Sequence, residues 1–137
     1  MFQSQSLRTP LTSIALITDS DHELILYTTF SNNENEHIPQ GLIKYGKKKL
    51  YFYNNKGKVS ENYSFCLLDF YVTDEHQRRG IGHILFESLL RYIKLEPCEI
   101  AYDRPSPKLL SFLSKHYSLT RPDYQPNKYV IYSGYPS

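Results

Sequence analysis

A nearly continuous apolar segment, a turn with two glycines and an amphipathic segment follow one another along the chain. This succession restricts the possible folds more than any other feature. Residues 65–72 (FCLLDFYV) are almost all apolar, which is typical of a central strand covered on both faces. Residues 81–94 repeat apolar side chains at helical spacing, which predicts an amphipathic helix. We therefore expect a sheet with a buried strand that is followed by a covering helix.

The flanking segments predict the remaining strands and helices. Strands are expected at residues 24–30, 41–45 and 49–53, and the last two should form a hairpin around a tight turn at 46–48. Residues 31–40 and 54–62 have the composition of loops, whereas residues 14–17 fit either a helical turn or a strand. Further strands are expected at 99–102 and 129–132, and Ser106 should cap a second helix that begins at Pro107. This order predicts an α+β sandwich around one mixed sheet.

The size and charge of the chain exclude several classes of protein. Its 137 residues are expected to form a single domain, residues 1–137, with a core of its own. Lys and Arg number 16 against 14 Asp and Glu, a net charge of +2, which is too balanced for a protein that mainly wraps nucleic acid. No apolar run approaches the roughly 18 residues of a membrane span, and no secretory signal is apparent. Cys66 and Cys98 supply neither a disulfide framework nor a metal quartet, so we expect no metal and a reducing compartment.

The turn between the apolar strand and the first helix has the properties of a diphosphate site. It reads Gln77-Arg78-Arg79-Gly80-Ile81-Gly82. The glycines let the backbone approach a ligand, and the helix start offers unpaired N–H groups and a positive dipole end. A Walker A loop is excluded because no Gly-Lys-Ser/Thr follows, and a dinucleotide fingerprint is excluded because Leu85 stands where the third glycine should be. An ordinary strand-to-helix turn with two glycines remains the alternative.

Several motifs together carry a resemblance to a known family. Gln-Arg-x-Gly-x-Gly after a buried strand resembles the acyl-CoA motif of the GNAT acetyltransferase superfamily. A closer resemblance, to the α-tubulin N-acetyltransferase family, extends over six segments of the chain. These are residues 66–72, 77–82 and 103–113, together with 10–13, 41–44 and 127–132. The resemblance implies a GNAT-like α+β fold with a mixed, mostly antiparallel central sheet flanked by helices. The strand and helix that the family carries ahead of the Pro10–Ser13 segment are either absent or belong to a part of the protein beyond this chain.

The resemblance implies acetyl-CoA as the co-substrate and two stretches that bind it. Strand backbone would pair with the pantetheine arm, and the glycine turn would hold the pyrophosphate. His83 stands where the family usually has Arg, which would weaken the phosphate contact at high pH, where His is neutral. The cofactor-binding residues expected on this basis are Phe70, Tyr71, Val72, Thr73, Gln77, Arg78, Arg79, Gly80, Ile81, Gly82, His83, Ser106, Lys108, Leu109, Ser111 and Lys115.

Three residues match catalytic positions of the family. The implied reaction acetylates a lysine amine, which has a pKa of about 10.4 and must lose a proton. Asp103 is expected to act as base or orienting charge, the alternative being a loop aspartate that pairs with Arg104. Cys66 is expected to line the site during direct transfer, the alternative being a small buried apolar residue. Gln5 would position the substrate lysine or a water, unless it is only a frayed polar residue near the chain end.

Five residues are candidates for binding the acceptor of the acetyl group. Asp69, an acid within the apolar run, is either a satisfied buried group or helps to hold the incoming peptide. Lys44, Lys47, Lys48 and Lys49 form a basic cluster, which is either a solvated turn or a patch for acidic tubulin. The resemblance favours α-tubulin in cytoplasmic microtubules, including those of cilia or flagella, as the partner. Two alternatives stay open: acetyl transfer to another protein or a small amine, and a degenerate domain that binds microtubules without turnover.

Overall fold

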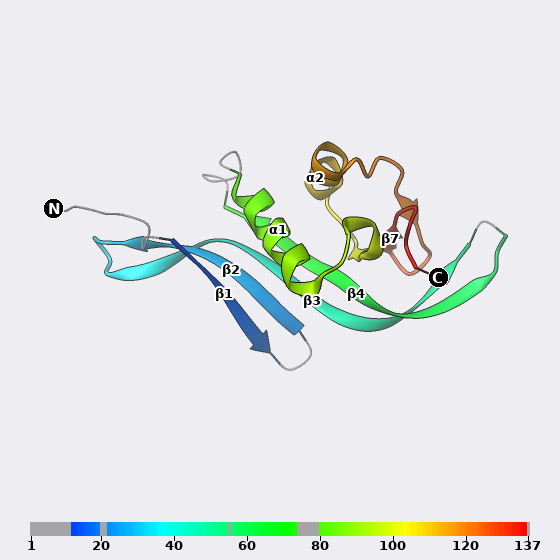
Figure 1. The fold of residues 1–137 in the computed structure, drawn as a ribbon, viewed down its shortest axis with the longest axis horizontal. Coiled ribbons are helices and arrows are strands. Elements are labelled where there is room, and N and C mark those ends of the chain that lie inside the picture. The colour runs from blue at the N-terminus through cyan, green and yellow to red at the C-terminus, as the bar shows by residue number, and fades with distance from the viewer. Residues whose placement is uncertain (1–11, 20–21, 55, 74–79, 137) are drawn as a thin grey trace.

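The computed structural model describes residues 12–19, 22–54, 56–73 and 80–136, and it contains seven strands and two α-helices in one arrangement (Figure 1). In chain order the elements are β1 (Thr12–Asp19), β2 (His22–Ser31), β3 (Glu36–Tyr53), β4 (Val59–Val72), α1 (Ile81–Ile93), the 3₁₀ turn η3 (Pro97–Glu99), β5 (Ala101–Asp103), α2 (Pro107–Tyr117), β6 (Asp123–Tyr124) and β7 (Tyr129–Ile131).

The strands form one mixed sheet in the order β1-β2-β3-β4-β5-β7-β6. Every neighbouring pair is antiparallel except β4 and β5, which are parallel. The expected α+β fold with a mostly antiparallel sheet flanked by helices is therefore confirmed. The expectations about a single domain and about elements ahead of Pro10 stay predictions, since residues 1–11 lie outside the described part.

The predicted hairpin at residues 41–53 is wrong, because this segment belongs to the single long strand β3. Gly46 and the lysines that follow it pair residue by residue with β4, from Gly46 opposite Cys66 to Tyr53 opposite Val59. A bulge between Lys44 and Tyr45 shifts the register without ending the strand. Glycine and consecutive lysines suggest a turn locally, but the hydrogen bonds to β4 hold this segment extended.

The loops predicted at residues 31–40 and 54–62 are too long, because pairing between strands extends into both segments. Strand β2 pairs with β3 as far as Ser31 opposite Glu36, so only residues 32–35 turn. Strand β4 begins at Val59, so the second loop is limited to residues 54–58, where the Asn54 side chain accepts the backbone N–H groups of Lys56 and Lys58 at 2.8 and 2.9 Å. Residues 14–17, for which the sequence allows two alternatives, form part of strand β1.

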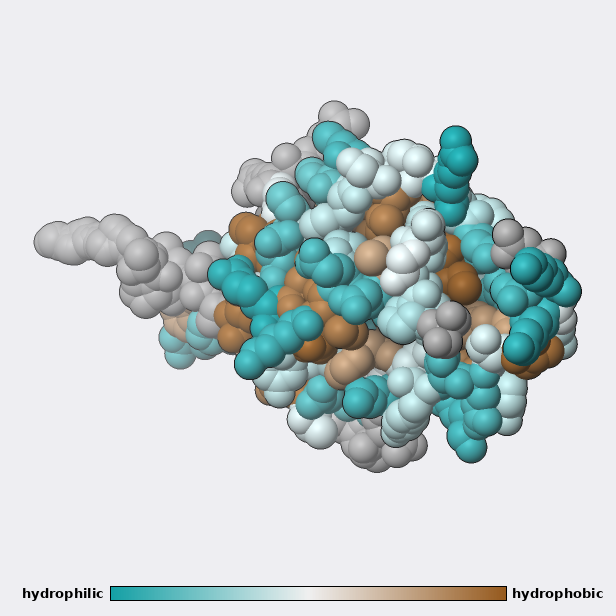
Figure 2. Space-filling view, turned by 45° about the vertical axis from the view of Figure 1, so that its right-hand side comes forward, coloured by the Kyte–Doolittle hydropathy of each residue, from teal (hydrophilic) through white to brown (hydrophobic). Residues whose placement is uncertain are grey.

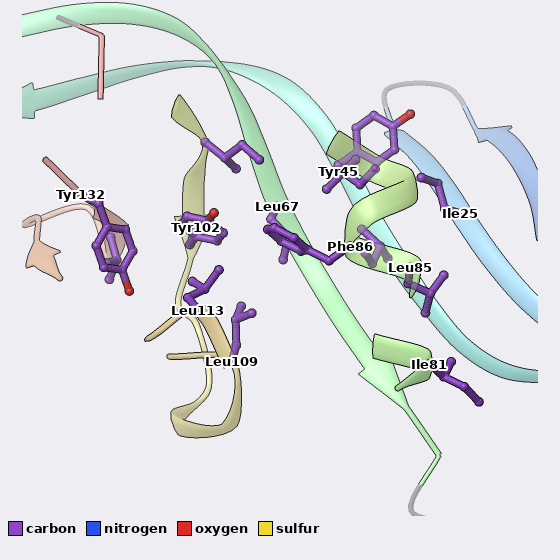
Figure 3. Close-up of a cluster of buried hydrophobic side chains, with 14 residues drawn as sticks. Ile25, Tyr45, Leu67, Ile81, Leu85, Phe86, Tyr102, Leu109, Leu113 and Tyr132 are labelled. Atoms are coloured by element: carbon purple, nitrogen blue, oxygen red, sulfur yellow. The ribbon is translucent and has the colours of Figure 1, made fainter. Parts of the chain in front are cut away.

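The main core lies between the helices and one face of the sheet (Figure 3). Helix α1 contributes four buried side chains and α2 contributes two, and they meet Leu67 of β4 and Tyr102 of β5. We call this side of the sheet the helix face. The predicted start of α2 is confirmed, because the Ser106 hydroxyl accepts the Leu109 N–H at 3.1 Å and Pro107 holds the first helical position.

A second, smaller cluster lies on the opposite face, which we call the open face. Phe52, Cys66, Ala101 and Tyr129 are its buried members. Neighbouring residues of a strand point to opposite faces, so Cys66 and Leu67, next to each other in β4, take part in different clusters. In Figure 2 the hydrophobic side chains of the described residues appear as separate patches bordered by hydrophilic ones.

Candidate active site

The parallel strands β4 and β5 run together for only a short distance. Their register pairs Cys66 with Ala101 and Leu67 with Tyr102, after which β4 continues to Val72 while β5 ends at Asp103. Among the strands that the structure describes, none pairs with residues 68–71 on the β5 side. Backbone N–H and C=O groups there can therefore bond to a ligand that carries amide groups.

The start of helix α1 offers donors for an anion. Gly80, the N-cap residue, has a φ of +77°, and an added Cβ would meet no atom of the described residues within 4 Å. No described side chain caps this end, and the first intrahelical bond runs from Ile84 N to the Gly80 oxygen at 3.0 Å. The three preceding helical N–H groups have no acceptor within the helix, which fits a phosphate. Gln77, Arg78 and Arg79 lie outside the described residues.

The second glycine of the turn also has a packing role, which the sequence did not indicate. A Cβ on Gly82 would lie 3.3 Å from Cζ of Phe70, so the missing side chain lets α1 pack closely against β4. Phe70 in turn contacts Phe86 and Phe112, with ring centroids 6.1 and 5.4 Å apart. Gly82 therefore supports the position of the helix start, while the described residues leave the space beside Gly80 open.

The expected cofactor residues on α2 fall into two groups. Lys108, Ser111 and Lys115 are exposed and share one side of the helix, being three and seven positions apart. Ser111 and Lys115 also line a hollow of about 330 Å³, together with Tyr132. Leu109 is buried in the core with only 7% of its surface exposed, so it holds the helix in place.

His83 joins the two helices. Its ring stacks on that of His116 with centroids 4.5 Å apart, and its Nε2 lies 3.8 Å from a Glu87 carboxylate oxygen. The Tyr117 hydroxyl donates to the same carboxylate at 2.6 Å. Burial, helped by the neighbouring His83 and Lys115, lowers the pKa of His116. Packing between α1 and α2 is thus linked to histidine protonation.

Cys66 and Asp103 lie together on the open face of the sheet. Cys66 is fully buried, its thiol donates to the Ser64 carbonyl at 3.5 Å, and burial raises its pKa to about 11. Asp103 lies two residues beyond Ala101, the partner of Cys66, and therefore points to the same face. The structure thus brings together two of the three predicted catalytic residues, whereas Gln5 lies outside the described residues.

The Asp103 carboxylate is held by its neighbour Arg104. The guanidinium donates to both carboxylate oxygens, at 3.1 and 3.4 Å. Arg104 has a φ of +40°, and its N–H donates to the Lys128 carbonyl at 3.1 Å. This left-handed backbone conformation places the Arg104 guanidinium beside the Asp103 carboxylate. The pairing that the sequence offers as an alternative is present, and it orients a carboxylate that stays 17% exposed.

The four lysines do not form one cluster. Lys47 and Lys49 point to the helix face, where Lys47 Nζ lies 4.9 Å from the Phe65 ring centre and Lys49 pairs with Glu61 at 3.3 Å. Lys44 and Lys48 point to the open face, beside the site of Cys66. Asp69 pairs in register with Lys44 and is exposed, so its interpretation as a buried, satisfied acid is wrong.

Sequence reasoning missed Tyr129 as part of this site. It occupies the first position of β7, directly opposite Asp103, and packs in the cluster that contains Cys66. In sequence it stands within an apolar strand and looks like an ordinary core residue. Only the pairing of β5 with β7 brings it to Asp103, and no local pattern carries that information.

Three further features of the described residues concern a hollow, metal binding and membrane spans. A hollow of about 770 Å³ lies at the far end of α1 between Arg91, Lys94 and Leu119, and none of the predicted site residues lines it. Within the described ranges, no group of three or more His, Cys, Asp or Glu side chains is placed to hold a metal ion. No helix of the described residues is long and apolar enough to cross a membrane.

Comparison with known proteins agrees with this geometry. The family model for the GNAT acetyltransferase Mec-17 matches residues 2–137. An α-tubulin N-acetyltransferase of Anopheles gambiae is 41% identical over 133 residues, covering 97% of this chain and 27% of that protein. The α-tubulin N-acetyltransferase 1 of Danio rerio is 40% identical, with 97% and 45% covered. That of Phytophthora infestans is 39% identical, with 93% and 69% covered.

The chain thus spans less than half of the length of the two animal relatives. The family match, by contrast, covers nearly all of this chain, including both helices and every described strand. The resemblance inferred from the sequence motifs is therefore confirmed. The chain belongs to the Mec-17 family of GNAT acetyltransferases.

Proposed function

We propose that this chain is a lysine N-acetyltransferase that moves the acetyl group of acetyl-CoA to a lysine of α-tubulin in microtubules. One observation carries the proposal: Asp103 and Cys66 lie on the same face of the sheet, next to the point where β4 and β5 separate. The names of the relatives, α-tubulin N-acetyltransferase, support the choice of acceptor.

Acetyl-CoA use is implied by membership of a GNAT family, and the residues present fit this co-substrate. The open start of α1 at Gly80 suits its pyrophosphate, and the unpaired side of β4 suits its amide-containing arm. Ser106, Lys108, Ser111 and Lys115 would lie along the second helix that borders it. The bound co-substrate supplies an acetyl thioester, and the remaining requirements fall to side chains of this chain.

Asp103 would take the proton that the lysine amine must lose. Its carboxylate is partly exposed and oriented by two hydrogen bonds from Arg104. Cys66 would line the site without reacting, because its buried thiol has a pKa of about 11 and is protonated near neutral pH. Transfer of the acetyl group would then be direct, from the thioester to the amine.

The acceptor protein would approach the open face of the sheet. Lys44 and Lys48 there offer positive charge to an acidic surface, and Asp69 offers a carboxylate to a lysine or arginine of the incoming segment. Lys47 and Lys49, on the other face, would contribute less. An enzyme acting on microtubules would work in the cytoplasm on the cytoskeleton, and cilia or flagella are one such setting.

The proposal is tested by measuring acetyl transfer from labelled acetyl-CoA to three acceptors: assembled microtubules, histone and a small polyamine. Incorporation into a lysine of α-tubulin, well above that of the other two, is the expected result. More efficient labelling of histone or the polyamine would favour a different acceptor. Microtubule binding and acetyl-CoA binding without any transfer would favour a non-catalytic binder.

A further inference from the structure

The turn between β6 and β7, residues 125–128, holds the backbone of Arg104. The Arg104 N–H donates to the Lys128 carbonyl at 3.1 Å. Lys128 itself has a φ of +74°, a left-handed conformation that is uncommon for a residue with a side chain, and its N–H donates to the Gln125 carbonyl at 3.0 Å. The position of the Lys128 carbonyl therefore depends on the turn, and the backbone of Arg104 depends on that carbonyl.

Gln125 attaches this turn to the end of β3. The residue is buried, with 7% of its surface exposed. Its side-chain oxygen accepts the Tyr53 N–H at 2.8 Å, and its side-chain amide group donates to the Tyr53 carbonyl at 3.2 Å. The Gln125 N–H donates to the Tyr129 carbonyl at 2.9 Å. Breaking the bonds of a buried amide leaves polar groups without partners, which is costly, so Gln125 holds the start of the turn firmly.

A second amide of the turn makes a weaker attachment to the same strand. The Asn127 side chain donates to the Tyr51 carbonyl at 3.2 Å and accepts the Tyr129 N–H at 3.0 Å. Asn127 is exposed, so water can replace its bond to Tyr51 at little cost. The buried side chain of Gln125 is therefore the stronger of the two attachments between the turn and β3.

We propose that Gln125 is a positioning residue for the acetyl transfer, an inference that rests on the proposed function. By anchoring the turn to β3, it keeps the Lys128 carbonyl where the Arg104 N–H can reach it. The bond to this carbonyl stabilises the left-handed backbone of Arg104, whose φ is +40°. The Arg104 guanidinium then stays on the Asp103 carboxylate. Gln125 acts through Arg104 and exchanges no proton with the substrate.

The test compares Gln125→Met with Asn62→Ala. The first keeps a side chain of similar volume and removes both bonds to Tyr53. The second is the matched control, because the Asn62 amide also joins a strand of the β3–β4 pair to the last part of the chain, donating to the Pro136 carbonyl at 2.8 Å. Hydrogen exchange of the Arg104 backbone N–H reports its bond to Lys128 without any turnover. Steady-state kinetics on assembled microtubules give kcat and the KM for acetyl-CoA.

We expect Gln125→Met to speed exchange of the Arg104 N–H and to lower kcat, each about 3- to 10-fold, the equivalent of one weakened hydrogen bond. The KM for acetyl-CoA should stay unchanged. In an Arg104→Ala background, Gln125→Met should change kcat by less than about twofold, because the residue through which it acts is gone. Asn62→Ala should leave the exchange of the Arg104 N–H and kcat as they are in the parent.

Unchanged exchange of the Arg104 N–H in Gln125→Met would overturn the inference, and so would an equal fold loss of kcat with and without the Arg104 side chain. If Gln125→Met does not fold, Gln125→Glu is measured by the same criteria, since it keeps the acceptor for the Tyr53 N–H and loses only the donor. A parent that is inactive, but whose Arg104 exchange responds to the substitution, would count against the proposed function, so the two failures can be told apart.

Discussion

The side chain of Cys66 shows how burial limits the chemistry of a residue. The thiol is enclosed by the cluster on the open face, and its pKa of about 11 leaves about one molecule in 10⁴ as thiolate at pH 7. Nucleophilic attack by this sulfur is therefore disfavoured. We therefore expect the Cys66 side chain to fill space beside the reacting groups.

Cys66→Ala should consequently keep measurable acetyl transfer and lose far less activity than removal of the Asp103 charge. The loss of the sulfur from a closed cluster should lower the free energy of unfolding by about 1–2 kcal/mol. Turnover assays and denaturant unfolding check the two expectations. Detection of an acetylated Cys66 by mass spectrometry of the rapidly quenched reaction would contradict direct transfer.

His116 is expected to make stability depend on pH. Its pKa is lowered in the folded chain by burial, His83 and Lys115, so the unfolded chain takes up the proton at a higher pH than the folded chain does. Stability should therefore fall as the pH drops through about 6.5 and stop falling below the folded pKa.

His116→Gln should reduce the difference in Tm between about pH 7.5 and about pH 5.5. His22→Gln, a change at the first position of β2, is the control and should keep the parental difference. Equal pH dependence in the parent and His116→Gln would show that the stacked pair does not govern this part of the stability.

Strand β3 determines which lysines lie on the open face, the face that we propose for the acceptor. An 18-residue strand alternates its side chains between the two faces, so adjacent lysines are separated by the thickness of the sheet. Lys44 and Lys48 lie on the face of Cys66, while Lys47 stacks over Phe65 and Lys49 pairs with Glu61 on the other face. The predicted hairpin would instead have placed all four lysines together at its turn.

Two double charge reversals of equal size test whether the acceptor approaches the open face or the helix face. Lys44→Glu with Lys48→Glu should raise the KM for microtubules about tenfold or more at low salt, because repulsion replaces attraction near the site. Lys47→Glu with Lys49→Glu should have a clearly smaller effect, and both should converge with the parent at high salt. A larger effect of the second pair would place the acceptor on the helix face.

Across the whole molecule, local patterns predict the helices better than the ends of the strands. The Ser106 cap and the apolar spacing of α1 lie within the segments they define, and both helices lie where these patterns predict them. The extent of β3 depends on hydrogen bonds to β4, which lies far away in sequence, so Gly46 and its lysines look like a turn when only their neighbours are considered. The same limit hides Tyr129, whose relation to Asp103 exists only through the β5–β7 register.

Two features of the molecule lie near the point where β4 and β5 stop pairing. A helix start that no described side chain caps lies on one side, and an oriented carboxylate lies on the open face of the sheet. Cofactor binding and proton removal should therefore depend on different residues. A substitution at the carboxylate should affect turnover and leave acetyl-CoA affinity in place.

The most direct measurement is turnover on assembled microtubules by Asp103→Asn, together with its acetyl-CoA affinity by calorimetry and its Tm as a check on folding. The amide keeps the shape but removes the charge and the proton acceptor. We predict a loss of about 10²- to 10⁴-fold in kcat, the usual contribution of acid–base catalysis, with acetyl-CoA affinity changed by less than about twofold. A folded Asp103→Asn variant that turns over as fast as the parent would contradict the proposed mechanism.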